Sequence, residues 1–321
     1  MHIAVDIGGT QLRAACYSTG SLTPLALKKV PTRDPHATPL ERLKALIASV
    51  WPEEGNVKAI GAAAPGPLDP FHGIVLEAPN IPGWVNLPLR KELEERFQVP
   101  VTLGNDANLA ALGEWEYGAG RGHHHLVYLT ISTGIGGGVI IDDRLLLGQR
   151  GLAAELGHIT VLPGGPLCAC GHRGHLEAVA SGTAIARWVQ DEMAHGAVSS
   201  LPANQPLTAK RIAQAAQAGD ELAIAALRRA GDFVGQATAD FLHIFNPSIV
   251  IIGGGVSRSG SFFMDPLRQS LQEHVLTPQY LENFQLSVAA LGDEAGLMGA
   301  LALARHLTQG QKVASYGPPS S

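Results

Sequence analysis

Several features typical of secreted, membrane and nucleic-acid-binding proteins are scarce or missing in this sequence. The chain has 321 residues, of which three are cysteine and 16% are charged. Cys168 and Cys170 are too close in sequence for an ordinary disulfide, and Cys16 falls in an expected strand, so we expect no disulfide framework and a reducing compartment. No apolar run approaches the roughly 18 residues that span a bilayer. The sequence contains no run of basic residues of the kind that would indicate a nucleic-acid contact.

The first residues, Met1 to Asp6, enter an expected strand directly, without the basic region and cleavage site of a signal peptide. We therefore expect a cytoplasmic protein without membrane or nucleic-acid partners. A hydrophobic fraction of 45% and a net charge of −5 are typical of a globular enzyme, and the length is sufficient for two domains.

The most specific pattern is a group of metal-ligand side chains with two glutamates beside it. Two thiolates and two imidazoles can complete a closed tetrahedral zinc site. Such a metal does not require the carboxylates, which are therefore free to bind another ligand. We thus expect a structural metal that shapes a small-molecule pocket. The group consists of Glu155, His158, Cys168, Cys170, His172, His175 and Glu177.

Two glycine-rich turns, each expected between two strands, have the composition of phosphate-binding loops. The first contains Asp6, Gly8, Gly9 and Thr10, and the second runs from Thr133 to Gly138. Glycines let backbone N–H groups approach anionic oxygens, and an aspartate can hold Mg2+ through water. Either turn alone could be an ordinary hairpin turn. Together they suit a nucleotide clamped between two similar α/β lobes.

Asn105 and Asp106 follow an expected strand and open an expected helix. This position has two interpretations. Asn and Asp are common helix N-caps, whereas a carboxylate beside a bound phosphate can act as the base for an attacking hydroxyl. Asn80 has an amide suited to sugar hydroxyls, and we interpret Trp84 at the end of the same loop as a packed residue. Gly253 to Gly255 can either accept an adenine or end a strand.

These motifs together resemble the ROK family (repressors, open reading frames, kinases), which belongs to the actin/hexokinase/Hsp70-like ATPase superfamily. The resemblance covers about residues 2–308. It is carried by residues 6–10, 65–69, 80–84, 105–107, 133–138, 155–158, 168–177, 253–255 and 291–300.

The resemblance implies a two-lobed α/β fold of the ribonuclease-H-like (actin-like ATPase) type. Each lobe would be a mixed sheet with flanking helices, with the active site in the cleft between the lobes. The small N-terminal lobe would span 1–115 and be joined by a C-terminal helix at about 293–308. A large lobe, 116–292, would hold the zinc motif, and a loose tail would follow at 309–321.

The implied activity is transfer of the γ-phosphoryl group of ATP to the 6-hydroxyl of a hexose, with glucose first (EC 2.7.1.-). ATP, Mg2+ and structural Zn2+ are implied as cofactors, and Asp106 as the general base. The implied sugar ligands are Asn80, Asn105, Asp106, Glu155, His158 and Glu177. The implied nucleotide ligands are Asp6, Gly8, Gly9, Thr10, Thr133, Gly134, Gly254 and Gly255. The implied zinc ligands are His158, Cys168, Cys170 and His175.

One residue departs from the pattern of the family. The usual zinc set is one histidine and three cysteines, and His175 stands in place of the third cysteine. Two thiolates with two neutral imidazoles still form a good site. We expect zinc to be retained and to be released at a higher pH upon acidification, because an imidazole protonates more readily than a bound thiolate.

Other substrates and roles stay open. Within the same chemistry, the alternatives are an N-acetylglucosamine or N-acetylmannosamine kinase and a mannose or fructose kinase, which differ around C2 of the sugar. A repressor would carry a helix-turn-helix before the first turn, and residue 6 leaves no room for one. A sugar-sensing regulator without that domain is a further alternative. Polyphosphate-dependent relatives generally lack the cysteine block, which favours ATP. A homodimer is expected by analogy alone.

Overall fold

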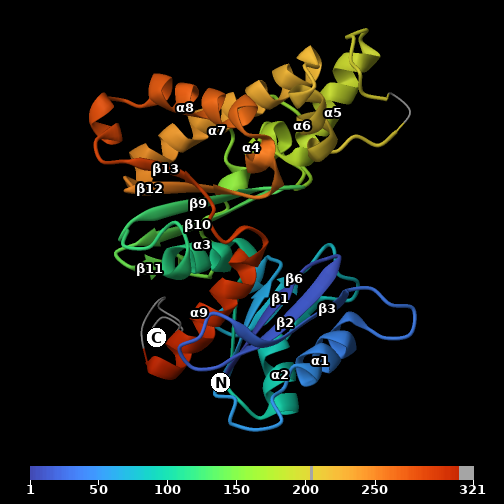
Figure 1. Cartoon of the computed structure of the whole chain (residues 1–321), viewed down its shortest axis with the longest axis vertical. Helices are drawn as coiled ribbons and strands as arrows, with labels where there is room; N and C mark the ends of the chain where they lie inside the picture. Colours follow the sequence, from blue (N-terminus) through green and yellow to red (C-terminus); the bar gives the residue numbers. More distant parts are fainter. Residues whose placement is uncertain (203–204, 311–321) are drawn as a thin grey trace. The chain divides into compact units, whose positions relative to one another are not determined.

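In the computed structural model, which describes residues 1–202 and 205–310, the chain folds into both strands and helices, with most strands in the first half and a run of helices after them (Figure 1). The chain divides into two units. The first contains Met1–Gly122, Gly138–Ala154 and Ala290–Ser321, and the second contains His123–Gly137 and Glu155–Ala289. This division differs from the sequence-based one in that 116–122, 138–154 and 290–292 fall in the first unit.

The strands are β1 (His2–Ile7), β2 (Gln11–Tyr17), β3 (Pro24–Pro31), β4 (Ala59–Ala64), β5 (Leu68–Asp69), β6 (Ile74–Glu77), β7 (Val85–Leu87), β8 (Val101–Asn105), β9 (Leu126–Ile131), β10 (Ile135–Ile141), β11 (Arg144–Leu145), β12 (Ile249–Gly253) and β13 (Gln285–Val288). The α-helices are α1 (Pro39–Ser49), α2 (Leu89–Phe97), α3 (Asp106–Tyr117), α4 (Leu176–Ala180), α5 (Gly182–Ala194), α6 (Ala209–Gln217), α7 (Glu221–Phe245), α8 (Ser261–His274) and α9 (Ala295–Gln309). The 3-10 helices are η1 (Leu156–His158), η2 (Gly255–Ser259), η3 (Pro278–Leu281) and η4 (Gly292–Glu294).

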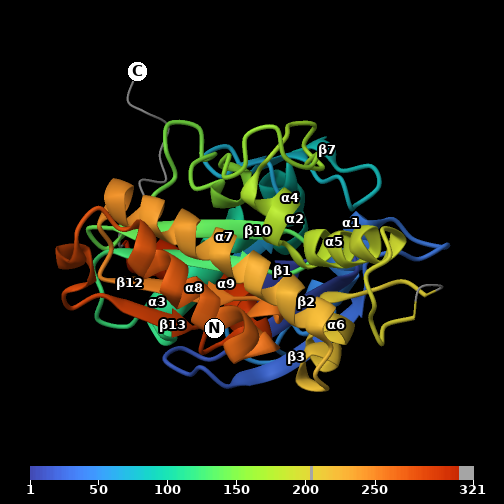
Figure 2. The same ribbon diagram turned by 90° about the horizontal axis from the view of Figure 1, so that it is seen from above.

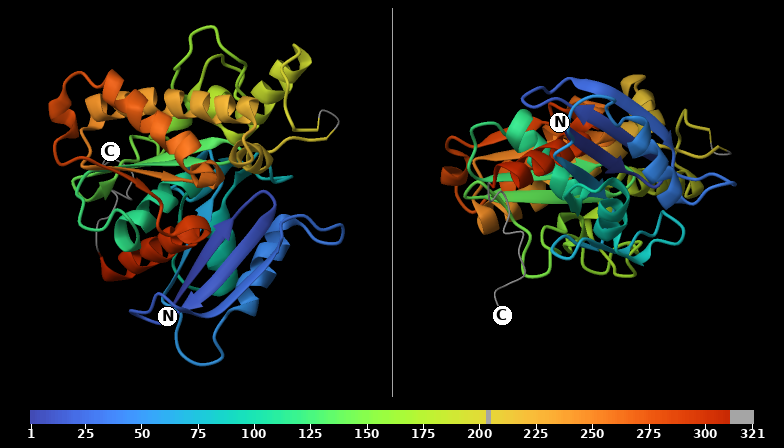
Figure 3. Two further views of the ribbon diagram at one scale, coloured as in Figure 1. Left: turned by 45° about the horizontal axis from the view of Figure 1, so that its top comes forward. Right: turned by 90° about the horizontal axis from the view of Figure 1, so that it is seen from below.

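The sheet of the first unit has the strand order β3-β2-β1-β4-β8, in which β1 to β3 are antiparallel and β1, β4 and β8 are parallel. Successive side chains of its strands enter different cores, as the two-residue period of a strand requires. Ile3 and Val5 pack into the core with α1 and α2, and Ala4 packs into the core with α3 and α9. Helices α1 and α9 lie on opposite sides of this sheet (Figure 3).

The face of this sheet toward α9 is made of small residues. Ala4, Ala15 and Ala63 belong to it and are fully buried. A Cβ added to Gly61 in β4 would overlap the carbonyl oxygen of Ala300 in α9. The small residues therefore let the backbone of α9 approach the centre of the sheet.

The second five-stranded sheet has the order β11-β10-β9-β12-β13, with β9, β12 and β13 parallel. Strand β12 is buried throughout, which is typical of a parallel strand with both faces covered. Helices α7 and α8 run side by side over this sheet (Figure 2). Their close contact depends on small residues, since a Cβ on Gly231 of α7 would lie 2.5 Å from the carbonyl oxygen of Phe263 in α8.

Several predicted elements differ from the structure. Residues 135–138, predicted to be part of a glycine-rich turn, already belong to β10. Strands β5, β6 and β7, which form a small antiparallel sheet, were missed because each is short. Of the predicted loose tail, Gln309 still ends α9, and residues 311–321 lie outside the described residues. Among the described residues, no helix is both long enough and apolar enough to cross a membrane.

Candidate functional site

The first glycine-rich turn joins β1 to β2 in a tight arrangement. The N–H of Gly8 donates to the carbonyl oxygen of Gln11 at 2.9 Å, and the hydroxyl of Thr32 donates to the carbonyl oxygen of Gly8 at 2.6 Å. A Cβ on Gly9 would lie 2.6 Å from the Cβ of Asn80. Glycine at this position therefore allows the loop that carries Asn80 to lie against the turn, which brings two predicted motifs together.

Asp6 is paired with an arginine that the sequence analysis did not identify. The Asp6 Oδ2 atom accepts bonds from Nη2 and Nε of Arg13 at 2.5 and 3.0 Å. Arg13 also donates to Glu294 at 2.9 Å and to the carbonyl oxygen of Asp293 at 2.5 Å. Strand register could have indicated this pair, because Asp6 and Arg13 lie opposite each other on β1 and β2.

Asp106 is the first residue of α3 and is exposed, directly after β8 ends at Asn105. Asn105 is the N-cap, and its side-chain oxygen accepts bonds from the N–H groups of Ala107 and Asn108 at 3.0 and 3.4 Å. The Asp106 Oδ1 atom accepts a bond from Ala107 N–H at 2.8 Å. Because Asn105 provides the cap, the carboxylate of Asp106 is not required for that role. The carboxylate lies at the positive end of the helix dipole.

The loop before β7 carries one exposed and one buried predicted residue. Asn80 is exposed, and its carbonyl oxygen accepts a bond from Arg33 at 3.3 Å. The side chain of Trp84 is 3% exposed and belongs to the core with α1 and α2. The interpretation of Trp84 as a packed residue is therefore confirmed.

The second turn lies at the N-terminus of α5. The carbonyl oxygen of Thr133 accepts a bond from the hydroxyl of Thr183 at 2.8 Å, and that of Ser132 accepts one from Gly182 N–H at 2.7 Å. The Glu177 Oε2 atom accepts a bond from Ile135 N–H at 2.9 Å, and a Cβ on Gly134 would overlap that oxygen. The turn is thus held in place by the start of α5 and by Glu177, which is a predicted sugar ligand.

Two glycines after β12 have different environments. Gly254 has a φ of +83°, and a Cβ there would overlap the carbonyl oxygen of Ile131, so its backbone requires glycine. A Cβ on Gly255 would meet no atom within 4 Å. The open face beside Gly255 leaves room for a flat ligand, whereas Gly254 is required by the fold itself.

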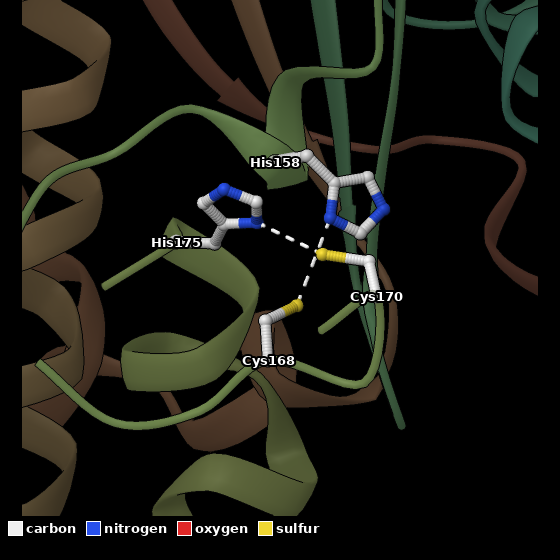
Figure 4. A group of neighbouring side chains, drawn as sticks. All are labelled: His158, Cys168, Cys170 and His175. Carbon is white, nitrogen blue, oxygen red and sulfur yellow. Dashed lines mark hydrogen bonds between the residues drawn. The ribbon is translucent and has the colours of Figure 1, made fainter. Parts of the chain in front are cut away.

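The predicted metal ligands lie together. One ligand atom from each of the four residues lies within 4.8 Å of every other one (Figure 4). The Cys168 Sγ and His158 Nδ1 atoms are 3.7 Å apart, and the Cys170 Sγ and His175 Nδ1 atoms are 3.2 Å apart. Zinc bonds of about 2.3 Å to sulfur and 2.0–2.1 Å to nitrogen would place tetrahedral ligands about 3.3–3.8 Å apart. The donor set and its spacing therefore fit a zinc ion. The cluster consists of His158, Cys168, Cys170 and His175.

The two thiols differ in acidity. Burial, together with the nearby carboxylate of Glu177, raises the pKa of the Cys168 thiol to about 11. The backbone N–H of His172 helps to lower the pKa of the exposed Cys170 thiol. A metal that binds here would displace a proton from Cys168, as thiolate ligation generally requires.

The structure also locates the two flanking glutamates and one more histidine. Glu155 is exposed and precedes η1, which ends at His158. Glu177 lies in the first turn of α4, with Oε1 3.5 Å from Cys168 Sγ. His172 Nδ1 lies 3.8 Å from Cys170 Sγ and is outside the four-residue cluster.

The predicted site residues thus divide between the two units. The first unit holds Asp6, Gly8, Gly9, Thr10, Asn80, Asn105 and Asp106. The second unit holds Thr133, Gly134, Glu155, His158, Cys168, Cys170, His175, Glu177, Gly254 and Gly255.

Comparison with known proteins gives a consistent result. The model of the ROK family matches residues 2–307. The glucokinase of Thermotoga maritima is 41% identical over 94% of this chain and 96% of its own length. A ROK family glucokinase from Streptomyces griseus, solved in complex with glucose and AMPPNP, has a TM-score of 0.80 and 37% identity and covers 95% of this chain and 99% of its own. A xylose repressor of Caldicellulosiruptor bescii is 34% identical over 77% of this chain and 62% of its own length.

Proposed function

Because the chain belongs to the ROK family, we propose that it is an ATP-dependent hexose 6-kinase with glucose as its preferred acceptor (EC 2.7.1.-). The observation that carries this proposal is the 41% identity to a glucokinase over 94% of the chain. The glucose and AMPPNP in the Streptomyces griseus structure support both substrates. The arrangement of the motifs within each unit supports the roles that follow.

We assign the general base to Asp106. An exposed carboxylate at a helix N-terminus is ionised at neutral pH and can accept the proton of the 6-hydroxyl as that oxygen attacks the γ-phosphorus. Asn105 and Asn80, from the same unit, would bind other sugar hydroxyls. Because the Asn105 Oδ1 atom caps α3, its NH2 group is the part proposed to meet the sugar.

The first turn, Gly8 to Thr10, would bind phosphate. Because the N–H of Gly8 already donates to Gln11, the contacts are assigned to the backbone N–H groups of Gly9 and Thr10 and the hydroxyl of Thr10. Asp6 is proposed to hold Mg2+ through water, and the two bonds from Arg13 to its Oδ2 atom fix the carboxylate. Mg2+ would supply charge neutralisation on the phosphates. The residues of the chain contribute mainly position and electrostatics, as in other phosphoryl transfers.

In the second unit, we assign phosphate contacts to Thr133 and Gly134 and adenosine contacts to Gly254 and Gly255. The free face beside Gly255 supports the adenosine assignment. Glu155, His158 and Glu177 are the further sugar ligands. The resemblance to the family implies that these three side chains bind sugar hydroxyls.

We also propose that the cluster of two cysteines and two histidines binds a structural Zn2+. His158 Nδ1 faces Cys168, so this nitrogen would bind the metal and Nε2 would be the ring atom proposed to face the sugar. Zinc would tie the segment after Cys168 to η1 and fix the direction of His158.

The proposed activity is tested by measuring ADP release with ATP and Mg2+ against glucose, mannose, fructose, N-acetylglucosamine and N-acetylmannosamine in parallel. Glucose should give the highest kcat/KM. A higher value with an N-acetylhexosamine, mannose or fructose would replace glucose with that substrate and keep the kinase. Absence of turnover with all five sugars, from protein that contains about one zinc per chain, would reject the kinase.

The second candidate is a sugar-sensing regulator, which the similarity to a xylose repressor favours. If the protein is such a regulator, calorimetry should detect sugar binding while no ADP is released.

We further propose a homodimer, which light scattering coupled to size-exclusion chromatography would test through the molar mass.

A further inference from the structure

A buried carboxylate near the end of α3 is bonded to backbone N–H groups from two separate segments. Glu114 is 0% exposed. Its Oε1 atom accepts a bond from Leu291 N–H at 2.7 Å. Its Oε2 atom accepts bonds from Ala119 N–H at 2.9 Å and from Ala290 N–H at 3.1 Å. Three donors on one buried carboxylate satisfy a charge that would otherwise be costly to bury.

Both segments are places where the chain passes from one unit to the other. The chain first leaves the first unit after Gly122 and returns to it for the last time at Ala290, while residues 138–154 also belong to the first unit. We call residues 118–122 the exit segment and residues 290–294 the return segment. The carbonyl oxygen of Glu114 also accepts bonds from the N–H groups of Gly118 and Gly120 at 3.0 and 2.9 Å. Glu114 therefore accepts three bonds from the exit segment and two from the return segment.

The helix that carries Glu114 also carries Asp106 at its other end. Helix α3 is packed tightly on α9, because a Cβ on Gly113 would lie 2.5 Å from the carbonyl oxygen of Ala295. The return segment is held a second time by Arg13, which bonds Glu294 and Asp6. The two segments are thus fixed to the same elements that position the proposed base and the proposed magnesium ligand.

We propose that Glu114 is a positioning residue for the phosphoryl transfer, which acts by anchoring the exit and return segments to α3. This inference rests on the proposed kinase function. Hinge segments far from the chemistry commonly affect kcat and KM together. The proposed base and the proposed sugar ligand Asn105 lie at the start of the helix that carries Glu114, so loss of this anchoring should lower glucose affinity and kcat.

The test compares Glu114→Gln with the matched control Glu116→Gln. The two glutamates lie two residues apart in α3, but Glu116 bonds the side chain of His306 at 2.7 Å and neither segment. Glutamine at 114 has one oxygen acceptor and a donor NH2 group, so it cannot accept all three N–H bonds. A second variant, Gly118→Ala, displaces the carboxylate without removing it, because the new Cβ would overlap Glu114 Oε2.

The first readout is backbone hydrogen exchange, which does not depend on turnover. Peptides over 118–122 and 290–294 should exchange at least about tenfold faster in Glu114→Gln and Gly118→Ala, whereas Glu116→Gln should match the unaltered protein. The second readout is the Kd for glucose and the kinetic constants. Glucose affinity should fall about tenfold, with kcat also lowered, within the usual range of coupling between distant positions.

Unchanged exchange in both segments would overturn the anchoring. Faster exchange with unaltered glucose Kd and kcat would overturn the positioning role and leave Glu114 as a structural residue. If the unaltered protein neither binds nor phosphorylates glucose, the proposed function fails. The exchange data still decide whether Glu114 holds the two segments.

Discussion

At the scale of single residues, the function of Asp106 depends on a division of labour with its neighbour. Asn105 satisfies the first N–H groups of α3, so the carboxylate of Asp106 remains exposed at the helix start. An amide at 106 would keep the bond from Ala107 N–H to Oδ1 and would replace the other, basic oxygen with an NH2 group. The base can therefore be tested without disturbing the helix.

We expect Asp106→Asn to lower kcat by about 10²–10⁴-fold, the usual contribution of a positioned base. The Kd for glucose should change by less than about threefold, since the amide can still bond a hydroxyl. Steady-state kinetics and calorimetry would measure the two quantities. Asp265→Asn, which removes an exposed carboxylate paired with Arg268, is the control. Retention of more than about a tenth of kcat would contradict the assignment.

Arg13 is the second residue whose role can be tested alone. Its planar guanidinium makes two bonds to Asp6 and one each to Glu294 and the carbonyl of Asp293. Lysine keeps the charge and cannot reproduce this pattern of donors. Arg13→Lys should therefore raise the KM for MgATP about tenfold, equivalent to about 1.4 kcal/mol, with an unaltered Kd for glucose.

The control for this variant is Arg268→Lys, where the arginine makes an exposed pair with Asp265. Titration of activity with Mg2+ would separate an effect on the metal from one on the nucleotide. A KM for MgATP within twofold of the unaltered protein would show that Asp6 does not depend on Arg13.

At the scale of elements, the sequence predicted the positions of the main strands and helices and the composition of the metal cluster. The long helices and buried strands have strong periodicity, and the cluster has strict ligand chemistry. The error at 135–138 has a physical cause, because the glycines that indicated a turn serve close packing within β10. A Cβ on Gly137 would lie 2.7 Å from side-chain atoms of Leu156, and one on Gly138 would lie 2.5 Å from Ala111.

Other parts of the site could not be predicted from spacing. The three bonds to Glu114 come from residues 119, 290 and 291, and the last two are distant in sequence. The contact between Gly9 and Asn80 likewise joins two loops that only the fold brings together. Sequence patterns report local periodicity and ligand type, whereas these contacts depend on tertiary packing.

The metal cluster gives the prediction for an element. Cys170→Ser should reduce zinc content from about one per chain to less than about a third, because a hydroxyl is a poor ligand for zinc. His175→Cys should retain zinc, since it restores a three-thiolate set. Cys16→Ala, which changes a buried cysteine of the first unit, is the control for loss of a thiol. Metal analysis after gel filtration would measure the content, and full zinc content in Cys170→Ser would reject this ligand.

At the scale of the whole molecule, stability should depend on pH through a buried histidine. The His2 side chain is 3% exposed, and its Nε2 atom lies 3.0 Å from the hydroxyl of Thr308 at the end of α9. Burial, with the N-terminal amino group, Arg305 and Lys58 nearby, lowers the pKa of His2 from 6.5 to about 4. The histidine thus joins the first strand to the last helix in its neutral form.

The sign of the effect follows from the proton balance. Between pH 6.5 and 4 the unfolded chain binds a proton at His2 that the folded chain does not, so the free energy of unfolding falls as the pH falls through this window. The full loss near pH 4 is roughly 2–4 kcal/mol. The pKa of Asp220 is lowered to about 2. Its contribution to the free energy of unfolding is therefore lost mainly below pH 3.8, beneath the window in which His2 titrates.

We therefore expect the Tm of the unaltered protein to fall steadily from pH 7 to 4.5, and that of His2→Gln to fall less over the same interval. Glutamine can still bond Thr308 and does not titrate, so the difference between the two curves isolates the histidine. Differential scanning calorimetry across this range would measure it. Parallel curves for the two proteins would show that His2 has the same pKa in the folded and unfolded states. The link between β1 and α9 would then not respond to protons.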